Sequence, residues 1–427
     1  MTDTIFALSS GSPPAAVAIV RSSGPQAFAA GEAIAGPLPP PRQAAVRELT
    51  DPRSGERIDE ALVLRFSAPA SATGEDIVEY QCHGGRAVVN ALLDALASLP
   101  GMRLAQPGEF TRRAFANGRI DLTEAEGLAD LLEAETESQR RAALLMAEGG
   151  LRRRVEDWRA RLVELSARAE AAIDYADDTE ETGADEAALA MAAAELAKEL
   201  GSWLDRPGAE ALKQGIRVVV AGPPNAGKSS LVNALAGGEK AIVTDIAGTT
   251  RDVIEVPVAI AGVPLLLVDT AGLRLSDDKV EAIGVARAEG QVQRADILLW
   301  LGEPGQAPRH SGTILVHAQA DRPERRQAPE GSLAVSAVTG EGLGELGARI
   351  IAEARARLPA EGEMALNRRQ ALEVGQAIDA LQQARGENLV LIADALRQAR
   401  AAFDRLSGRA AVEDVLDALF GRFCLGK

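Results

Sequence analysis

The spacing of hydrophobic residues divides the chain into segments with different repeats. Near the N-terminus, strand-like runs such as "AAVAIVRSS" and "EDIVEYQCHGG" alternate with the segment "GRAVVNALLDALASL", whose hydrophobic residues follow the spacing of a helix. This mixture of short strands and a helix predicts an α+β domain over residues 1–118.

A helical block is predicted next, over residues 119–213. Hydrophobic residues recur in it at steps of four and three, at Leu151, Val155, Trp158, Leu162 and Leu165. That spacing places them on one face of an amphipathic helix. A second helical segment, with hydrophobic residues again at helical spacing, is predicted over residues 361–427.

Between the two helical segments, over residues 214–360, short apolar runs such as "IRVVVAG", "PLLLVDT" and "DILLWLG" alternate with helical stretches. Strands that follow one another through helices predict a doubly wound, mostly parallel sheet. The expected fold is therefore a multidomain α/β protein, in which an α/β domain is inserted into a helical domain. Two separate helical domains on either side of the α/β unit would give the same pattern.

The composition narrows the class of protein. A chain of 427 residues is long enough for two to four domains, and it has no apolar run of about 18 residues that would span a membrane. Two cysteines favour a reducing compartment, so we expect a cytoplasmic protein. Because the net charge is −16, any bound nucleic acid must meet a local basic patch or a basic partner.

The stretch "VVVAGPPNAGKSSLVNAL" places the motif G-x-x-x-x-G-K-S between a predicted strand and a predicted helix. The backbone amides of such a loop and the N-terminus of the helix offer hydrogen-bond donors to phosphate groups. Lys228 is expected to reach the β- and γ-phosphates of a nucleotide, and Ser229 to ligate Mg²⁺.

Two further motifs point to a GTPase. The run "LLLVDTAGL" is a strand followed by D-x-x-G, in which Asp269 is expected to hold Mg²⁺ through water and the amide of Gly272 to meet the γ-phosphate. Between the two motifs, "TDIAGTTRD" has the position of a switch loop, with Thr250 as a candidate Mg²⁺ ligand. The residues predicted to bind GTP are Asn225, Ala226, Gly227, Lys228, Ser229, Ser230, Thr244, Asp245, Ile246, Ala247, Gly248, Thr249, Thr250, Asp269, Thr270, Ala271, Gly272, Asp321, Ser336 and Ala337.

The motif that reads the base departs from the usual N-K-x-D. The chain has "VHAQAD" at this place, so Ala318 and Gln319 replace the asparagine and the lysine. Asp321 remains, and its carboxylate can accept hydrogen bonds from N1–H and from the 2-amino group of guanine. Ser336 and Ala337 occupy the position of the S-A-K loop. We therefore expect the chain to prefer guanine, but less strongly than a GTPase with an intact N-K-x-D motif.

Hydrolysis poses a separate question, because Ras-like enzymes place a glutamine after D-x-x-G to orient water and this chain has Leu273 there. Either hydrolysis is negligible or another group orients the water. The carbonyl of Asn225, in the phosphate loop, can coordinate a monovalent cation, and such a cation would neutralise charge that develops on the phosphates.

In this order, the motifs resemble those of the MnmE family of tRNA modification GTPases (also called TrmE), within the TrmE-Era-EngA-type GTPase superfamily. The resemblance extends over essentially the whole chain and includes "HGG", "PGEFTRRAF", "DLTEAEG" and the terminal "CLGK". It implies a potassium-stimulated GTPase with a Ras-like GTPase domain, which forms a homodimer through a folate-binding N-terminal domain. It also implies a heterotetramer with the flavoprotein MnmG that takes part in 5-carboxymethylaminomethyl modification of the wobble uridine (position 34) of certain tRNAs.

The resemblance also assigns roles to individual residues. The implied cofactors are GTP, Mg²⁺, K⁺ and 5-formyl- or 5,10-methylene-tetrahydrofolate. The implied residues are Asn225, Thr244, Ile246 and Thr249 for K⁺; Ser229, Thr250 and Asp269 for Mg²⁺; Lys228 and Glu281 for catalysis, with Glu281 orienting water; and Arg21, Glu79, Arg119 and Lys427 for folate. Arg119 stands where relatives commonly have lysine.

The chain ends in "GRFCLGK", with Cys424 in the fourth-last position. A terminal lysine does not fit a prenylation box. The resemblance implies that this end of the chain lies near the folate, which makes Cys424 a candidate for the modification chemistry. Two other functions fit parts of the sequence. One is a GTP-dependent switch such as a ribosome-assembly factor, which would share the middle domain only. The other is a folate- and nucleotide-binding scaffold with little hydrolysis.

Overall fold

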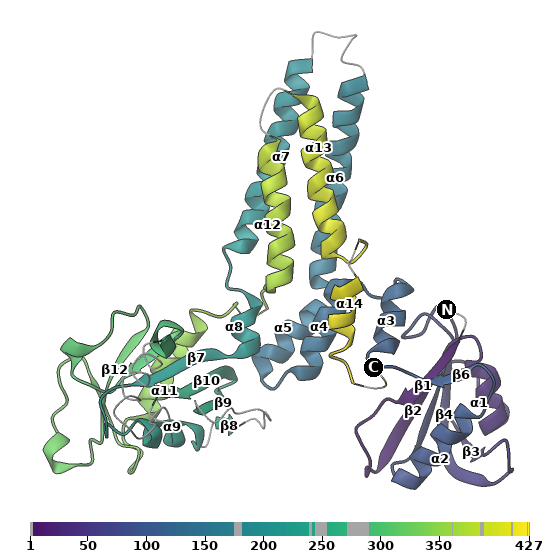
Figure 1. Cartoon of the computed structure of the whole chain (residues 1–427), viewed down its shortest axis with the longest axis horizontal. Coiled ribbons are helices and arrows are strands. Elements are labelled where there is room, and N and C mark those ends of the chain that lie inside the picture. Colours follow the sequence, from purple (N-terminus) through teal and green to yellow (C-terminus); the bar gives the residue numbers. More distant parts are fainter. Residues whose placement is uncertain are drawn as a thin grey trace, which may run out of the picture. The chain divides into compact units, whose positions relative to one another are not determined.

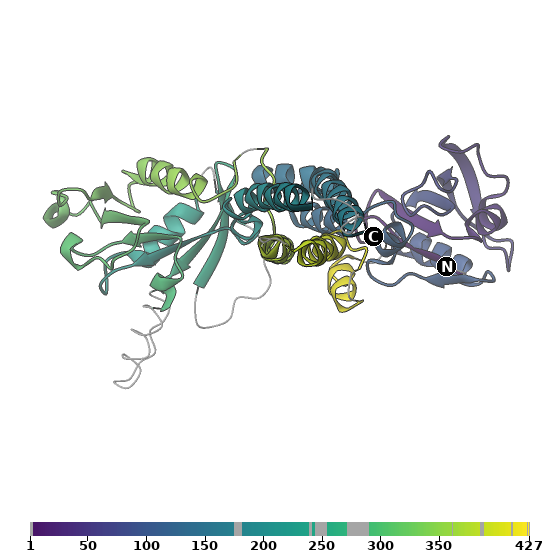
Figure 2. The same cartoon turned by 90° about the horizontal axis from the view of Figure 1, so that it is seen from above.

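In the computed structural model the chain forms two units (Figures 1 and 2). The first combines Met1–Ala129 with Leu151–Val155 and Asp404–Lys427, and the second combines Asp130–Gly150 with Glu156–Phe403. The structure describes residues 3–174, 182–238, 241–243, 254–270, 290–360, 362–384, 388–410, 413–424 and 426. Among these residues, no helix is long and apolar enough to cross a membrane.

A six-stranded sheet forms the framework of the first unit, with strand order β3-β4-β5-β2-β1-β6. Its strands are β1 (Thr4–Leu8), β2 (Val17–Ser23), β3 (Ala45–Thr50), β4 (Arg57–Phe66), β5 (Ile77–His83) and β6 (Met102–Leu104). Neighbouring strands are antiparallel except for the parallel pair β1 and β6. The helices α1 (Ala27–Ala35) and α2 (Arg86–Ala97) contribute Ile34 and Leu92 to one core with Phe6 and Val20 of the sheet.

Three shorter helices complete the first unit: α3 (Glu109–Ala116), α4 (Leu122–Glu133) and α14 (Glu413–Phe420). The rings of Phe115 and Phe420 lie 6.0 Å apart, so α3 and α14 meet through aromatic side chains. The amide of Leu122 donates to the carbonyl of Ser407 at 3.1 Å. The end of the chain thus packs on the segment that follows the N-terminal sheet.

A buried arginine in the "PGEFTRRAF" motif fixes α3 to the sheet. The side chain of Arg113 is fully buried and forms ion pairs with Asp3 at 3.0 Å, Glu75 at 3.2 Å and Glu109 at 3.1 Å. Arg103 is a second cation in this network and also pairs with Asp3 and Glu109. Three carboxylates that come from separate parts of the chain are therefore held by two guanidinium groups.

The network changes the titration of its carboxylates. Burial raises the pKa of Glu109, but the hydrogen bonds from Arg103, the Gln106 amide and Arg113 lower it by more, so the net pKa is below the usual value. A carboxyl with a lowered pKa in the folded state stabilises the fold above its unfolded pKa, about 4.3 for glutamate. The stabilisation by Glu109 is lost as the pH falls from the unfolded pKa through the lowered pKa of the folded state.

Four long helices, most of whose residues belong to the second unit, form a bundle and run side by side in Figures 1 and 2. They are α6 (Gly150–Asp174), α7 (Thr182–Leu204), α12 (Arg368–Gln383) and α13 (Leu389–Leu406). The five hydrophobic residues predicted to share one face of α6 are all buried. At the centre, the ring of Trp158 packs 5.3 Å from Trp203 and 5.7 Å from Phe403. Because α7 and α12 are in contact, helices from both sides of the α/β domain build one bundle.

A seven-stranded sheet lies between α7 and α12 in the sequence, with strand order β13-β12-β11-β7-β10-β9-β8. Its strands are β7 (Ile216–Ala221), β8 (Ala241–Val243), β9 (Ile254–Ile260), β10 (Val263–Asp269), β11 (Ile297–Trp300), β12 (Thr313–Ala318) and β13 (Leu333–Val335). Five neighbouring strands, β13, β12, β11, β7 and β10, pair in parallel. Strands β9 and β8 extend the sheet beyond β10 with antiparallel pairing. The predicted fold class is therefore confirmed, including the inserted, mostly parallel α/β domain.

The helices α9 (Lys228–Ala236) and α11 (Leu343–Arg355) bury Leu231 and Ile350 in the same core as Val218 and Val220 of β7. Val219 points to a separate core on the opposite face. Strand β7 is covered on both faces, which explains why its sequence is a continuous apolar run rather than an alternating one.

Two sets of contacts tie the α/β domain to neighbouring segments of its unit. The amide of Ala209, at the start of α8 (Ala209–Gln214), donates to the carbonyl of Leu366 at 3.0 Å, so the chain segments that enter and leave the domain are bonded to each other. In α5 (Glu137–Ala147), the Ser138 hydroxyl donates to the Gly262 carbonyl at 2.6 Å. The predicted boundaries 119–213, 214–360 and 361–427 stay predictions.

Replacing Arg113 with methionine should lower the free energy of unfolding of the first unit by about 3–5 kcal/mol, because Glu75 loses its ion-pair partner and Asp3 and Glu109 keep only Arg103. Hydrogen exchange of the slowest amides in α3 and β5, followed by mass spectrometry, measures this locally. The matched control is Arg112→Ala, since Arg112 pairs with the exposed carboxylates of Glu413 and Asp417 and such pairs contribute about 0–1 kcal/mol. Equal losses in both variants would contradict a structural role for the buried network.

Candidate functional site

The phosphate loop follows the carboxyl end of β7, as predicted. It turns through positive φ angles at Gly222 (151°), Asn225 (62°) and Gly227 (94°) before α9 begins at Lys228. Gly227 is the N-cap of α9, and no side chain caps the helix. The first amides of α9 are therefore available to an anion, which the helix dipole also favours.

Two charged residues of the predicted phosphate site are nearly buried beside this loop. Lys228 is 9% exposed, and its ammonium donates to the carbonyls of Gly222 at 3.0 Å and Pro223 at 2.9 Å. Asp269, the last residue of β10, is 2% exposed and pairs in register with Val220 of β7. The structure thus places the ammonium on the loop that would wrap phosphates, and the carboxylate at the end of the adjacent strand.

The donors in this region suit a nucleotide with a bound Mg²⁺. The Ser229 hydroxyl is exposed at the start of α9, and the Asp269 carboxylate is a hard oxygen ligand of the type that Mg²⁺ prefers, often through water. The hydroxyl of Thr270 donates to the Val220 carbonyl at 2.8 Å and holds the end of β10 against β7. Among the described residues, no cluster of three or more His, Cys, Asp or Glu forms a metal site made of protein ligands alone.

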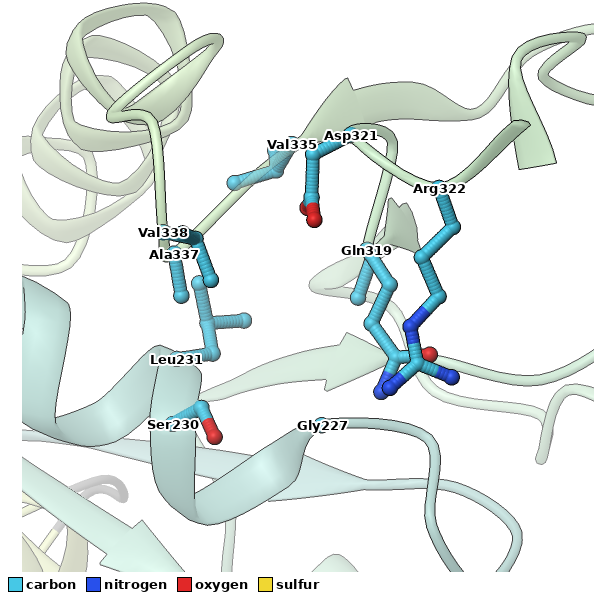
Figure 3. A pocket seen from close by; sticks show the side chains of 10 residues that line it. Gly227, Ser230, Leu231, Gln319, Asp321, Arg322, Val335, Ala337 and Val338 are labelled. Atoms are coloured by element: carbon cyan, nitrogen blue, oxygen red, sulfur yellow. The ribbon is translucent and has the colours of Figure 1, made fainter.

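A second part of the site is an open pocket between the phosphate loop and the ends of β12 and β13, with about 500 Å³ of empty space if the solvent at its mouth is included (Figure 3). It is lined by Gly227, Ser230, Leu231, Ala318, Gln319, Asp321, Arg322, Val335, Ala337 and Val338. Figure 3 shows Leu231, Ala337 and Val338 on one side and Gln319 and Arg322 on the other. The pocket therefore has an apolar wall facing a polar one.

The carboxylate of Asp321 is fixed by the loop after β13. The hydroxyl of Ser336, which is fully buried, donates to Oδ1 of Asp321 at 2.6 Å and accepts from the amides of Val338 and Thr339. With one oxygen anchored in this way, the carboxylate still has lone pairs for the N1–H and 2-amino donors of guanine. The structure brings together Asp321, Ser336 and Ala337, three of the residues predicted for base recognition.

Gln319, which replaces the usual lysine, contacts the phosphate loop. Its Nε2 donates to the carbonyl of Asn225 at 3.1 Å. A Cβ atom added at Gly227 would lie 3.3 Å from the same Nε2, so glycine permits this close packing. The sequence showed only that a lysine was missing, and the amide contact and the neighbouring Arg322 were not foreseen.

Eleven predicted site residues lie outside the described residues and stay predictions. They are Thr244, Asp245, Ile246, Ala247, Gly248, Thr249, Thr250, Ala271, Gly272, Glu281 and Lys427. Of the residues predicted for K⁺, the structure describes Asn225, which is exposed in the phosphate loop.

The structure describes three of the four residues predicted for folate. Arg21 and Glu79 face each other across β2 and β5 and form an ion pair at 2.8 Å, and the Arg21 guanidinium lies 5.8 Å from the ring of Phe110. Arg119 packs along Gly74, where an added Cβ would lie 3.2 Å from its Cγ.

The segments that carry Arg21 and Arg119 are linked by one contact. Ser23, two residues after Arg21 on β2, lies 2.7 Å from the hydroxyl of Thr73, which precedes Gly74. The strand of Arg21 and the loop under Arg119 are therefore neighbours.

The C-terminal segment that follows α14 passes close to the end of β1 at Gly426. Gly426 has a φ of 90°, and a Cβ atom there would lie 2.0 Å from the carbonyl oxygen of Leu8. Leu8 pairs with Val20, the residue before Arg21. The glycine of "CLGK" thus permits the tail to lie against the sheet near a predicted folate residue, and Cys424 is exposed.

Comparisons with known proteins agree with this arrangement. A family model described as the GTP-binding protein TrmE N-terminus matches residues 4–119, and a model of the MnmE helical domain matches residues 122–424. Proteins called tRNA modification GTPase MnmE are 52% identical in Novosphingobium aromaticivorans, over 100% of both chains, and 54% identical in Rhizorhabdus wittichii, over 100% of this chain and 97% of the other. The relative from Rhizobium meliloti is 45% identical over 100% of this chain and 99% of its own length.

Among solved structures, the G domain of the T. maritima FeoB iron transporter is 27% identical and covers 33% of this chain, with a TM-score of 0.24.

Changing Asp321 to asparagine should exchange guanine for xanthine. Xanthine carries an oxygen in place of the 2-amino group, so an amide can donate to that oxygen and still accept from N1–H. For GDP, the amide keeps the bond from N1–H without the charge and loses the bond from the 2-amino group, which predicts a fall of about tenfold to a hundredfold in affinity. Titrations of labelled GDP and XDP measure both effects. Unchanged preference for GDP would show that Asp321 does not read the base.

Proposed function

The chain belongs to the MnmE family of tRNA modification GTPases, and we propose that it hydrolyses GTP as part of a reaction that modifies tRNA. The observation that carries this proposal is the joint placement of three features on one α/β domain. These are the uncapped N-terminus of α9, the ammonium and carboxylate of Lys228 and Asp269, and the pocket that contains Asp321.

The described residues of the site would bind different parts of GTP. The first amides of α9 and the ammonium of Lys228 bind the phosphates, and Asp321 accepts hydrogen bonds from guanine. Ser229 and Asp269, together with Thr250, would hold Mg²⁺, and the bound ion supplies positive charge to the β- and γ-phosphate oxygens. The pocket and the phosphate loop meet at Gly227, so one nucleotide can occupy both.

We further propose that K⁺ stimulates hydrolysis. The proposed ligands are Asn225, Thr244, Ile246 and Thr249. Asn225 supports the proposal because it is an exposed residue of the phosphate loop, where a cation can offset charge on the phosphates. Since Leu273 cannot orient water, Glu281 is the proposed water-orienting residue.

The proposed tRNA reaction needs further partners. We propose a homodimer and a complex with the flavoprotein MnmG, in which Arg21, Glu79, Arg119 and Lys427 bind a tetrahydrofolate that supplies one carbon. The product would be 5-carboxymethylaminomethyl uridine at the wobble position of certain tRNAs, with Cys424 as a candidate participant. The net charge of −16 supports a reaction in which the partner provides much of the contact with tRNA.

GTP turnover should be at least about tenfold faster in KCl than in NaCl at equal ionic strength, because a bound cation stabilises the charge that develops during phosphoryl transfer. Phosphate release from the full chain measures the rate. The variant Asn225→Ala should lose the difference between the two salts. Equal rates of the unaltered protein in both salts would refute the potassium mechanism.

A strain that lacks this chain should lose the wobble-uridine modification, which mass spectrometry of tRNA nucleosides detects. The unaltered gene should restore the modified nucleoside, and Lys228→Ala should not, because the variant cannot hold the β- and γ-phosphates. A strain with normal wobble uridines in the absence of the chain would show that its biological role lies elsewhere.

A further inference from the structure

The base pocket raises a question that the family resemblance does not answer. In N-K-x-D the lysine stem lies along the base, but here the corresponding residue, Gln319, is engaged with the phosphate loop. We propose that Arg322 covers the exposed face of the bound purine and supplies the cation that this pocket would otherwise lack. The proposal rests on the proposed function, since it concerns the guanine nucleotide of the same site.

The backbone places Arg322 in position. A tight turn joins Gln319 to Arg322, in which the Arg322 amide donates to the Gln319 carbonyl at 3.1 Å and Gln319 adopts a positive φ of 61°. The amide of Ala320 donates to the Val335 carbonyl at 3.1 Å and fixes the turn to the end of β13. Figure 3 shows the side chains of Gln319 and Arg322 extending along the same side of the pocket.

The side chains of Gln319 and Arg322 differ in the contacts that hold them. The amide of Gln319 is held by the Asn225 carbonyl and packs on Gly227. The guanidinium of Arg322 makes no hydrogen bond or ion pair with another residue in the part of the chain that the structure describes. Arg322 is exposed and lines the pocket, so it can turn onto a base at little cost in broken contacts.

The chemistry of the pocket favours contact with the face of the base. Leu231, Ala337 and Val338 form an apolar wall on one side, and Asp321 occupies the edge where the Watson–Crick donors of guanine would lie (Figure 3). A flat purine between them leaves its second face toward Arg322. A planar guanidinium stacks well on aromatic rings, and such contacts change affinity by about three- to thirtyfold.

This placement separates affinity from selectivity. A cation on the face of the ring interacts with any purine, because it does not read the groups at the edge. Discrimination between guanine and its analogues stays with Asp321. Arg322 therefore sets how tightly the nucleotide binds rather than which base is chosen.

The test is a titration of the full chain with N-methylanthraniloyl-GDP. Arg322→Ala should weaken binding about three- to thirtyfold, and Arg322→Lys should lie between the variant and the unaltered protein, because the charge remains but the plane is lost. Arg326→Ala is the matched control: it removes the same charge four residues later, from an exposed side chain that does not line the pocket. It should change affinity by less than about twofold.

Competition with unlabelled nucleotides decides where Arg322 acts. Face contact predicts that Arg322→Ala weakens GMP, GDP and IDP by the same factor. A loss of affinity that is larger for GDP than for GMP would overturn the proposal, because it would place the guanidinium on the phosphates. A loss of affinity for GDP but not for IDP would overturn it too, because it would place the guanidinium on the edge of the base. Equal affinities of Arg322→Ala and Arg326→Ala would overturn it as well, while the GTPase function stands. Failure of the unaltered protein to bind GDP would instead refute the proposed function.

Discussion

The parallel pairing of β7 with β10 is the constraint on which the nucleotide site depends. It sets Asp269 opposite Val220 and lets Thr270 bond the carbonyl of that same residue. The carboxyl ends of both strands therefore meet at one edge, and the loops that follow them leave from the same place. A slip in register would move Asp269 and Thr270 away from Val220 and separate the two phosphate motifs.

Features that depend on local sequence could be predicted. The apolar face of α6 could be predicted from the helical spacing of its hydrophobic residues. The phosphate loop could be predicted from G-x-x-x-x-G-K-S, because all the residues of this motif lie in one short loop and at the start of the helix that follows it. The ion pair of Arg113 with Asp3, and the bond from Ser138 to Gly262, join residues more than a hundred positions apart. Nothing in the spacing of such residues signals their contact. Arg322 was missed for a different reason, since its role depends on the direction of a turn with a positive φ at Gln319.

The choice between lysine and arginine also has a physical pattern. The chain has only six lysines, yet it keeps Lys228, whose compact ammonium fits against the carbonyls of Gly222 and Pro223, where a planar guanidinium would be too large. Elsewhere arginine lies over aromatic rings, as Arg206 does on Trp203 at 4.3 Å and Arg65 on Phe28 at 5.3 Å. These positions show the two uses side by side, a flat cation packed on a ring and a compact ammonium held by loop carbonyls.

The bond between Ala209 and Leu366 bears on how the α/β domain is inserted in the chain. Two residues more than 150 positions apart are joined at 3.0 Å, so the chain leaves the helical bundle and returns to it at one point. An attachment of this kind lets an α/β domain lie between α7 and α12 in the sequence while those two helices still pack against each other.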